Sequence, residues 1–314
     1  MKRKIVVVGS CNTDMVIPVE HLPLPGETII GGDLLTNQGG KGANQAVAVA
    51  RFGGEVELIA RVGDDGFCRQ TIESLRREGV GTSRIQLTPG VPSGVALIAV
   101  DAKGENSIMV SSGANARLTP EDVEEAGAVL TEADVVLMQL ETPLPTLTKV
   151  ASLAHEAGCR VVLNPAPYPP TPLPAAFLGL IDLITPNETE AMAMSGVSIT
   201  DEASALEAIR AIRAQGVKQV VITAGGAGAY TELDGQLLHI KACPTHVVDT
   251  TAAGDTFCGV LCVALSEGAS LPEAIAQANR AAALSVTRRG AWQSIPYRRE
   301  VEEAKANSHP NHSL

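Results

Sequence analysis

The sequence predicts an α/β fold in which helices cover both faces of a mainly parallel central sheet. Short runs of β-branched and other apolar residues alternate along the chain with stretches of helical periodicity, as in repeated strand–helix–strand units. Most of these apolar runs are continuous rather than alternating. Continuous runs are typical of parallel strands that are buried on both faces.

The predicted elements follow one another in that rhythm. Apolar runs predict strands at residues 5–8, 56–60, 135–140, 160–164, 180–185 and 219–223. Helical periodicity predicts helices at residues 42–52, 66–78, 119–132, 145–157, 200–215, 254–266 and 271–288.

Two segments interrupt the alternation. Residues 14–36 contain a Pro-Gly pair between apolar stretches, and residues 94–111 contain a Lys-Gly pair in the same setting. Both patterns predict β-hairpins. Hairpins added to a parallel sheet form a lid or a dimer contact in some proteins and simple edge strands in others. The pattern alone leaves both interpretations open.

Composition excludes several classes of protein. The 314 residues are 45% hydrophobic, carry a formal charge of −11 and include only 3% aromatics, which argues against a nucleic-acid partner. No apolar run approaches the ~18 residues of a membrane helix. The basic start at residues 2–4 precedes an apolar run too short for a signal peptide. The six cysteines form no CxxC pair, so we expect a cytoplasmic protein that acts on small molecules, without a membrane partner.

The strongest chemical signal is a run of small residues before a predicted helix. Ala252, Ala253 and Gly254 leave the amides of the helix N-terminus open to an anion. Asp255 follows in the first turn, where its carboxylate can accept the proton of an alcohol during phosphoryl transfer. A structural interpretation stays open, in which Asp255 only complements the helix dipole.

Polar residues also follow the first strand and open the first helix. Residues 37–45 form a Gly-rich loop, but Gly42 follows Lys41, so the GxxxxGK[ST] pattern of a P-loop is not matched. The GxGxxG pattern of a dinucleotide-binding fold is absent after the first strand. Asn12 and Asp14 stand there instead; such a pair suits sugar hydroxyls, although Asx residues are also common in turns.

Two later strands are followed by further candidates. Asn187 and Glu190 lie three residues apart and face one way on a helical turn. They could organise Mg²⁺ through water, or they could mark an ordinary helix start. Residues 223–228 form another Gly-rich loop, which alone is a weak signal for a nucleotide.

Together these segments closely resemble the PfkB-type carbohydrate kinase family over residues 5–296. The run DTTAAGDTF at residues 249–257 marks the broad family. The runs GGKGANQA at 39–46, NPAP at 164–167 and TPNETEA at 185–191 are further specific matches, and GGKGANQ and PNETEA point to the ribokinase branch.

The resemblance implies a fold. This is the three-layer α/β/α arrangement of the ribokinase branch, with one domain over residues 1–300 and a C-terminal tail over 301–314. A small β-lid is implied at about residues 14–36 and 94–111, with a homodimer formed through it.

The resemblance also implies an activity and a set of site residues. The implied reaction is transfer of the ATP γ-phosphate to O5 of D-ribose, with Asp255 as general base. The implied anion hole is formed by the backbone amides of Ala252, Ala253, Gly254 and Asp255. Implied ribose-binding positions are Asn12, Asp14, Gly40, Lys41, Asn44, Glu141 and Asp255, with Ala96 and Ile108 lining the lid side. Implied nucleotide contacts are Asn187, Thr223, Ala224, Gly225, Gly226, Ala227, Gly228, Gly254 and Asn279.

Two metal sites are implied in the same way. Asn187 and Glu190 match a motif that organises Mg²⁺. The family is also activated by a monovalent cation, usually K⁺, whose implied ligands are Asp249, Thr251, Ser285, Arg288, Gly290 and Ser294.

The chain departs from the family pattern at Trp292 and Gln293, where the resemblance leads us to expect a smaller residue. The loop at 165–174 is also richer in proline than expected. Two alternative functions stay open: a kinase of another sugar such as 2-deoxyribose, and a non-catalytic sugar-binding protein on the same fold. A nucleoside is disfavoured as substrate because few aromatics are available to enclose its base.

Overall fold

The computed structural model describes residues 4–308, and its central sheet has nine strands. These are β1 (Lys4–Val8), β4 (Glu55–Gly63), β5 (Gly81–Thr88), β8 (Val135–Met138), β9 (Arg160–Leu163), β10 (Leu183–Ile184), β11 (Gln219–Thr223), β12 (Ala229–Leu233) and β13 (Gln236–Ile240). Their order in the sheet is β13-β12-β11-β10-β9-β8-β1-β4-β5. All pairings from β11 to β5 are parallel, and only β12 and β13 pair antiparallel.

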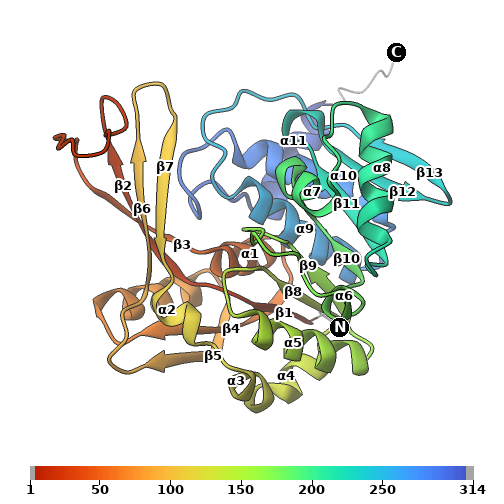
Figure 1. Cartoon of the computed structure of the whole chain (residues 1–314), viewed down its shortest axis with the longest axis horizontal. Coiled ribbons are helices and arrows are strands. Elements are labelled where there is room, and N and C mark those ends of the chain that lie inside the picture. The colour runs from red at the N-terminus through yellow and green to blue at the C-terminus, as the bar shows by residue number, and fades with distance from the viewer. Residues whose placement is uncertain (1–3, 309–314) are drawn as a thin grey trace.

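Helices cover both faces of this sheet, which confirms the predicted α/β/α layers (Figure 1). On one face lie α1 (Lys41–Arg51), α2 (Gly66–Arg77), α9 (Ala253–Ser266), α10 (Leu271–Ser285) and α11 (Arg298–Ser308). On the other lie α3 (Pro120–Glu125), α4 (Gly127–Thr131), α5 (Leu144–Glu156), α6 (Ala175–Leu178), α7 (Glu188–Ser195) and α8 (Glu202–Arg213). Along β1, Ile5 and Val7 pack into the first layer, and Val6 and Val8 into the second.

A second, four-stranded sheet stands at one side of the molecule (Figure 1). Its strands are, in order, β3 (Leu35–Gly39), β2 (Asn12–Pro18), β6 (Gly94–Val100) and β7 (Asn106–Ser111). The strand β2 pairs antiparallel with β3 and parallel with β6, and β6 and β7 form an antiparallel hairpin. We call these four strands the lid sheet.

The strand order places the candidate residues at one edge of the central sheet. From β1 the chain builds outward through β4 and β5 on one side and through β8 to β11 on the other. Open α/β sheets bind ligands at the carboxyl ends of strands around such a reversal of strand order. The segments that follow β1, β8, β9, β10 and β11 therefore meet along this carboxyl edge.

Several predicted boundaries are wrong. The helix expected at 119–132 is two helices, α3 and α4, which break at Ala126 before Gly127, a poor helix former. The strand expected at 180–185 is only Leu183–Ile184, because the amides of Leu180 and Ile181 complete the turn of α6. The helix expected at 271–288 ends at Ser285.

The lid and the tail also differ from expectation. Residues 19–34 of the first expected hairpin contain no strand, and three prolines from 18 to 25 remove the amides that a ladder needs. Residues 301–308, expected as tail, belong to α11, which is anchored by the buried Val301. The basic start at residues 1–3 and the rest of the tail at 309–314 lie outside the described residues.

Candidate active site

The first turn of α9 presents backbone amides that no side chain caps. Ala252, at the N-cap, adopts a left-handed conformation with φ of 59° and makes no side-chain cap hydrogen bond. A β-carbon built on Gly254 would meet nothing within 4 Å. The Ala253 amide donates to the Thr250 carbonyl at 3.2 Å, whereas the Gly254 and Asp255 amides are open to a negatively charged group, which the positive end of the helix dipole attracts.

Asp255 lies beside these amides and is 7% exposed. Its Oδ2 accepts a 2.9 Å hydrogen bond from Asn44 Nδ2, and its Oδ1 accepts one of 2.9 Å from Gln45 Nε2. Both donors come from the first turns of α1. The two hydrogen bonds fix the plane of the carboxylate and leave lone pairs for a further partner.

Gln45 belongs to a polar network that the sequence analysis did not assign to the site. Its Nε2 also lies 3.1 Å from Asn164 Oδ1, and its Oε1 accepts a 2.6 Å hydrogen bond from Gln139 Nε2. Gln139, at the end of β8, is fully buried. A polar residue at the carboxyl end of a buried apolar strand is the only signal in the sequence that could have identified it.

Three acidic residues and one lysine gather between the lid sheet and α1. The Glu141 carboxylate accepts hydrogen bonds from the Ser10 hydroxyl and, at 3.2 Å, from the Lys41 amide. Burial, together with the charges of Glu141 and Asp255, raises the pKa of Asp14 to about 6. Although burial opposes its charge, the carboxylates of Asp255 and Glu141 raise the pKa of Lys41.

Two glycines of β3 and α1 make room for this cluster. A β-carbon on Gly39 would lie 2.1 Å from Asp14 Oδ2. Gly40 has φ of +89°, and a β-carbon there would lie 2.6 Å from the Asn12 amide. Side chains at either position would displace the polar residues of β2.

The remaining lid-side candidates lie on one face of the lid sheet. Asn12 and Asp14 alternate along β2, and Asp14 pairs with Ala96 on β6. Ile108 pairs with Ile98, two residues beyond Ala96, so the register puts it on this same face. Asn12 Oδ1 accepts a 2.7 Å hydrogen bond from Asn115, while Ile108 is 53% exposed.

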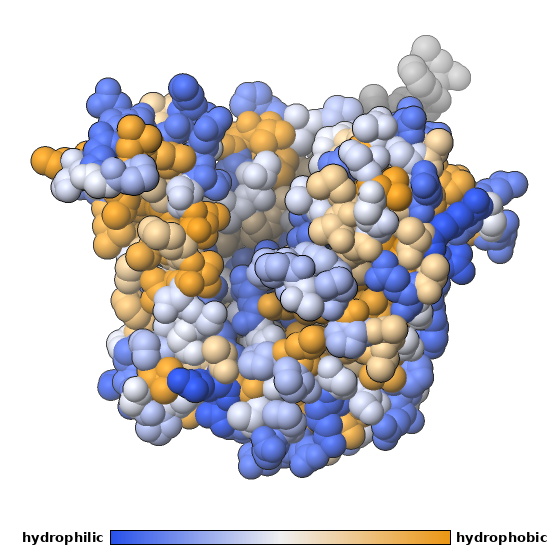
Figure 2. Space-filling view, viewed as in Figure 1, coloured by the Kyte–Doolittle hydropathy of each residue, from blue (hydrophilic) through white to orange (hydrophobic). Residues whose placement is uncertain are grey.

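A cavity of about 220 Å³ connects Asp255 to the later strands. Figure 2 shows the molecule hollowed between the lid sheet and the main body. The lining residues are Lys41, Asn164, Ala166, Thr185, Asn187, Glu190, Thr223, Thr250, Ala252, Ala253, Gly254, Asp255 and Cys258. Segments from β9, β10, β11 and α9 therefore converge on the open amides and the buried carboxylate.

Asn187 and Glu190 cap α7 through each other. Asn187 Oδ1 accepts from the Glu190 amide at 2.8 Å, and Glu190 Oε2 accepts from the Asn187 amide at 2.9 Å. Burial raises the pKa of Glu190, with the Asn187 amide acting against it. The predicted helix start is real, and both side chains also line the cavity.

The Gly-rich loop and Asn279 meet at the end of β13. The loop contains a single 3₁₀ turn, Gly225–Ala227, and the Ala224 amide donates to the Gly228 carbonyl. A β-carbon on Gly228 would lie 2.2 Å from the Ile240 carbonyl oxygen. Asn279, on α10, donates to that same carbonyl at 2.9 Å. Of this group only Thr223 lines the cavity.

The residues implied for a monovalent cation also converge. Asp249 Oδ2 accepts from the Gly290 amide at 2.8 Å, and Ser294 Oγ lies 3.5 Å from the Thr251 carbonyl oxygen. The Ser285 carbonyl accepts from the Arg288 amide. Burial disfavours the charge of Asp249, but hydrogen bonds from Thr251 and Gly290 lower its pKa.

Oxygen atoms are the main potential ligands both around Asp249 and around Asn187 and Glu190. Within residues 4–308 no group of three or more His, Cys, Asp or Glu side chains is arranged to hold a metal. Carbonyl oxygens with one carboxylate at Asp249 suit a hard monovalent cation. A single carboxylate, Glu190, suits Mg²⁺ that keeps most of its water and binds mainly to phosphate.

The side chains of Trp292 and Gln293 differ in how close they lie to the cation residues: a β-carbon on Gly290 would lie 2.9 Å from Gln293 Oε1, whereas Trp292 reaches α1. The Trp292 side chain is 5% exposed, and its Nε1 donates to Asn44 Oδ1 at 2.9 Å. Gln293 Nε2 donates to Asn37 Oδ1 on β3 at 3.2 Å. The two unexpected residues thus reach α1 and the lid sheet.

The sequence also predicts core positions for two cysteines and no membrane-spanning helix. All six cysteines are free, and Cys258 and Cys262 are core residues of α9, as predicted. No helix described between residues 4 and 308 has the length and apolar character needed to span a membrane.

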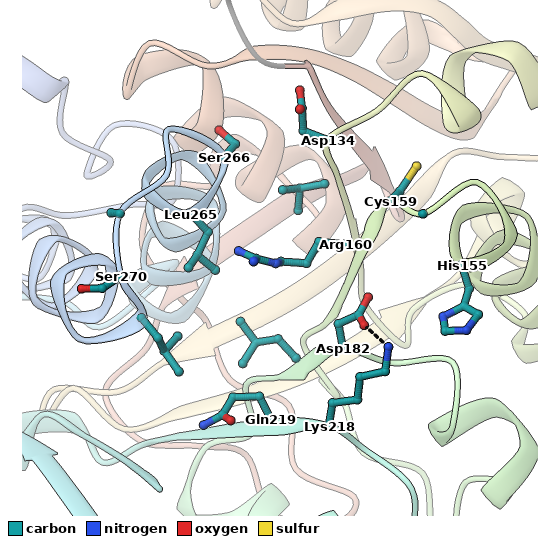
Figure 3. A pocket seen from close by; sticks show the side chains of 15 residues that line it. Asp134, His155, Cys159, Arg160, Asp182, Lys218, Gln219, Leu265, Ser266 and Ser270 are labelled. Atoms are coloured by element: carbon teal, nitrogen blue, oxygen red, sulfur yellow. Dashed lines mark hydrogen bonds and ion pairs between the residues drawn. The ribbon is translucent and has the colours of Figure 1, made fainter. Parts of the chain in front are cut away.

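A larger cavity, of about 710 Å³, lies at the amino ends of β8 to β11 (Figure 3). Lys218 Nζ lies 2.7 Å from Asp182 Oδ1 within it. It contains none of the residues that the sequence singled out.

Known proteins agree with this geometry. The model of the pfkB family of carbohydrate kinases matches residues 2–298. The chain is 43% identical over 303 residues to the ribokinase of Haemophilus influenzae, covering 96% of this chain and 98% of that protein. It is 34% identical over 292 residues to a deoxyribokinase of Salmonella typhi, covering 93% and 95%.

A solved structure is similar over the same length. The Arabidopsis thaliana ribokinase complexed with ribose and ATP superposes with a TM-score of 0.90 at 34% identity, covering 96% of this chain and 98% of that one. A family match over nearly the whole chain, together with a buried aspartate beside an open helix end, leads to one conclusion. The chain belongs to the pfkB family of carbohydrate kinases.

Proposed function

We propose that this sugar kinase is an ATP-dependent ribokinase, which phosphorylates O5 of D-ribose to give D-ribose 5-phosphate and ADP. The observation that carries the proposal is the Asp255 carboxylate, held by Asn44 and Gln45 beside the uncapped amides of α9. A base beside an anion site is the minimum that phosphoryl transfer to an alcohol requires. The ribokinase names of relatives at up to 43% identity support ribose as the acceptor.

In this mechanism the lid face and α1 bind the sugar. Asn12 and Asp14, on β2, approach it from the lid side, and Lys41, Asn44 and the Glu141 carboxylate approach from the body. The close backbone at Gly40 admits the ring, and Ala96 and Ile108 line the lid. Asp255 accepts the O5 proton as the new bond to phosphorus forms, because a carboxylate is too weak a base to ionise a free alcohol beforehand.

The nucleotide lies on the other side of Asp255. The open amides of Gly254 and Asp255, together with those of Ala252 and Ala253 beside them, stabilise charge on the transferring phosphoryl group. Lys41 lines the same cavity and adds positive charge. We place the rest of ATP along Asn187, Thr223 and the Gly-rich loop to Gly228, with Asn279 behind it.

Two cations complete the proposal. Mg²⁺ would be held near Asn187 and Glu190 through water and would neutralise phosphate charge. K⁺ would be held by the Asp249 carboxylate and by oxygens of Thr251, Ser285, Arg288, Gly290 and Ser294. Because these residues flank the turn before α9, a bound cation would stiffen that turn without contacting ATP.

We also propose that the lid sheet pairs with a second copy of this chain. On one lid face Leu97 is 45% and Met109 64% exposed, and on the other Ile108 is 53% and Val110 52% exposed. So much apolar surface on one small sheet is typical of an interface. Replacing Met109 with Glu should convert a dimer to a monomer in light scattering; a monomeric parent protein would contradict the pairing.

A cytoplasmic location fits this chemistry. The described cysteines are all free thiols, as in a reducing compartment. Cell fractionation that places the protein outside the cytoplasm would overturn this part of the proposal.

The direct test is ADP release from ATP and Mg²⁺ with D-ribose, 2-deoxyribose, fructose and adenosine in parallel, each in K⁺ and in Na⁺. We expect ribose-dependent release that K⁺ stimulates. Equal rates in K⁺ and Na⁺ would contradict the cation site alone. Release with none of the four acceptors would contradict the kinase and favour a sugar-binding protein.

A second acceptor merits one arm of that test. The similarity to a deoxyribokinase, at 34% identity, makes 2-deoxyribose the alternative substrate. A site that hydrogen-bonds a hydroxyl discriminates strongly against the analogue that lacks it. A higher kcat/KM for 2-deoxyribose than for ribose would keep Asp255 as base and reassign the contacts of Asn12 and Asp14.

A further inference from the structure

Trp292, in the loop before α11, is linked to Asp255 by hydrogen bonds through Asn44. Its indole Nε1 donates a 2.9 Å hydrogen bond to Asn44 Oδ1, and Asn44 Nδ2 donates one of 2.9 Å to Asp255 Oδ2. Trp292 is 5% exposed, Asn44 6% and Asp255 7%. The three linked side chains are therefore shielded from water. Hydrogen bonds are stronger in such a buried environment than in water.

The backbone around Trp292 is fastened to the helix that carries Asn44. Arg51 Nη1 donates to the carbonyl oxygens of Trp292 and Ile295, each at 2.6 Å. The same guanidinium forms two 2.7 Å hydrogen bonds with Glu78. Because Arg51 and Asn44 both lie on α1, the indole is held at a fixed position relative to the Asn44 amide.

The chemistry of the indole decides which way that amide points. An indole N–H only donates, whereas an asparagine amide has an accepting and a donating end. With Trp292 on one side, Asn44 must turn its oxygen toward the indole and its nitrogen toward Asp255. Without the indole N–H, the amide could rotate and place its oxygen against the carboxylate.

We propose that Trp292 is a positioning residue for phosphoryl transfer, acting through Asn44 on the orientation of Asp255. The inference rests on the proposed role of Asp255 as base. It assigns a function to one of the two residues at which the chain departs from its family's pattern. On the other carboxylate oxygen, Gln45 donates to Asp255 and accepts from Gln139, but Gln139 is an amide and lacks the donor-only character of the indole.

The composition of the chain permits a test that changes one atom group. Trp292 is the only tryptophan, so production in a tryptophan auxotroph can replace it alone with benzothienylalanine. Sulfur takes the place of the indole N–H in this analogue, while ring size and packing are kept. We expect kcat with ribose to fall about tenfold, the effect of one lost hydrogen bond in the transition state, with a small fall in Tm and an unchanged KM for ATP.

A double-mutant cycle identifies the path. In an Asn44→Ala background the analogue should cause no further fall in kcat, because the amide through which it acts is gone. Tyr297→Phe is the matched control, since it removes an aromatic hydroxyl from the same segment, 3.5 Å from Glu78 and 51% exposed; it should leave kcat unchanged.

Two outcomes would overturn the inference. One is a kcat within about twofold of wild type for the analogue. The other is an equal fall in kcat with and without the Asn44 amide, which would make the effect of Trp292 independent of Asn44. Loss of ribose-dependent turnover in the wild-type protein itself would instead contradict the proposed function, so the two failures are distinguishable.

Discussion

The two edges of the central sheet both carry cavities, and they differ in how charge is arranged. At the amino edge, in the larger cavity, Asp182 accepts from Lys218 (Figure 3) and also from the Val161 amide. Asp134, which also lines this cavity, accepts from the Lys4 amide. At the carboxyl edge, Asp14, Glu141 and Asp255 gather around Lys41.

The difference shows that cavity size does not identify the site. The amino edge holds acids that are satisfied within the fold, and it spans about 710 Å³. The cavity at the carboxyl edge is smaller, about 220 Å³, and is lined by Asp255. Asp255 lies close to the like charges of Asp14 and Glu141, an arrangement that costs folding free energy and is common where a ligand must be bound. The following experiments test that contrast, beginning with the largest expected effect.

Removing the base should abolish turnover without unfolding the protein. Asp255→Ala deletes the group that accepts the O5 proton, so kcat should fall by about 10³-fold or more. Tm should fall only slightly, because the loss of the hydrogen bonds from Asn44 and Gln45 is partly offset by the removal of a buried carboxylate. Rapid-quench measurement of phosphoryl transfer gives the rate. Activity within tenfold of wild type would remove Asp255 from its role.

Removing the lid-side acid should weaken ribose binding. Asp14→Asn keeps the shape of the side chain but loses the charge-assisted hydrogen bonds that a carboxylate makes to sugar hydroxyls. The KM for ribose should rise about 30-fold, which corresponds to about 2 kcal/mol, while the KM for ATP stays the same. Steady-state kinetics with Asp33→Asn, an exposed lid variant, provides the control.

The same variant should stabilise the fold at neutral pH. The pKa of Asp14 is raised from 3.8 to about 6 by burial and then by the charges of Glu141 and Asp255. Its ionisation therefore lowers the stability of the fold. This cost is absent below about pH 4 and is complete above about pH 7. Urea unfolding should show Asp14→Asn more stable by up to ~3 kcal/mol at pH 8 and equal at pH 4. A constant difference across that range would contradict the charge argument.

Breaking the amino-edge pair should have the smallest effect. Lys218→Ala removes the ion-pair partner of Asp182. The Lys218 side chain is 57% exposed. Exposed ion pairs contribute ~0.2–1 kcal/mol, so stability should change little and kcat/KM for ribose should stay within about twofold. A large loss of turnover would mean that the amino edge takes part in the reaction.

The two edges also differ in how far the sequence predicts them. Strand β11 has the predicted bounds, 219–223, because continuous apolar runs report buried parallel strands directly. The small residues before α9 and Asp255 within it form a local pattern too. The predicted Asp14, Lys41 and Asn44 gather around Asp255 because strand ends and helix starts meet at one edge.

The hydrogen bonds that orient Asp255, and the partners of Asn44 and Gln45 behind it, could not be predicted in this way. Gln45 and Gln139 lie 94 residues apart, and Asn44 and Trp292 lie 248 apart. No periodicity relates such pairs, because their contact is made by packing of the whole fold. In the sequence, Trp292 is notable only as a departure from the family's pattern. Its contact with Asn44 depends on how the loop that carries it packs against α1.

Hydrogen exchange with ribose and a non-hydrolysable ATP analogue tests the central contrast most directly. The account predicts that the two ligands together slow exchange at residues 9–14, 37–45 and 250–256 of the carboxyl edge. Exchange at residues 132–135, 158–160 and 216–219 of the amino edge should not change. Protection confined to the amino edge would contradict the assignment of the active site.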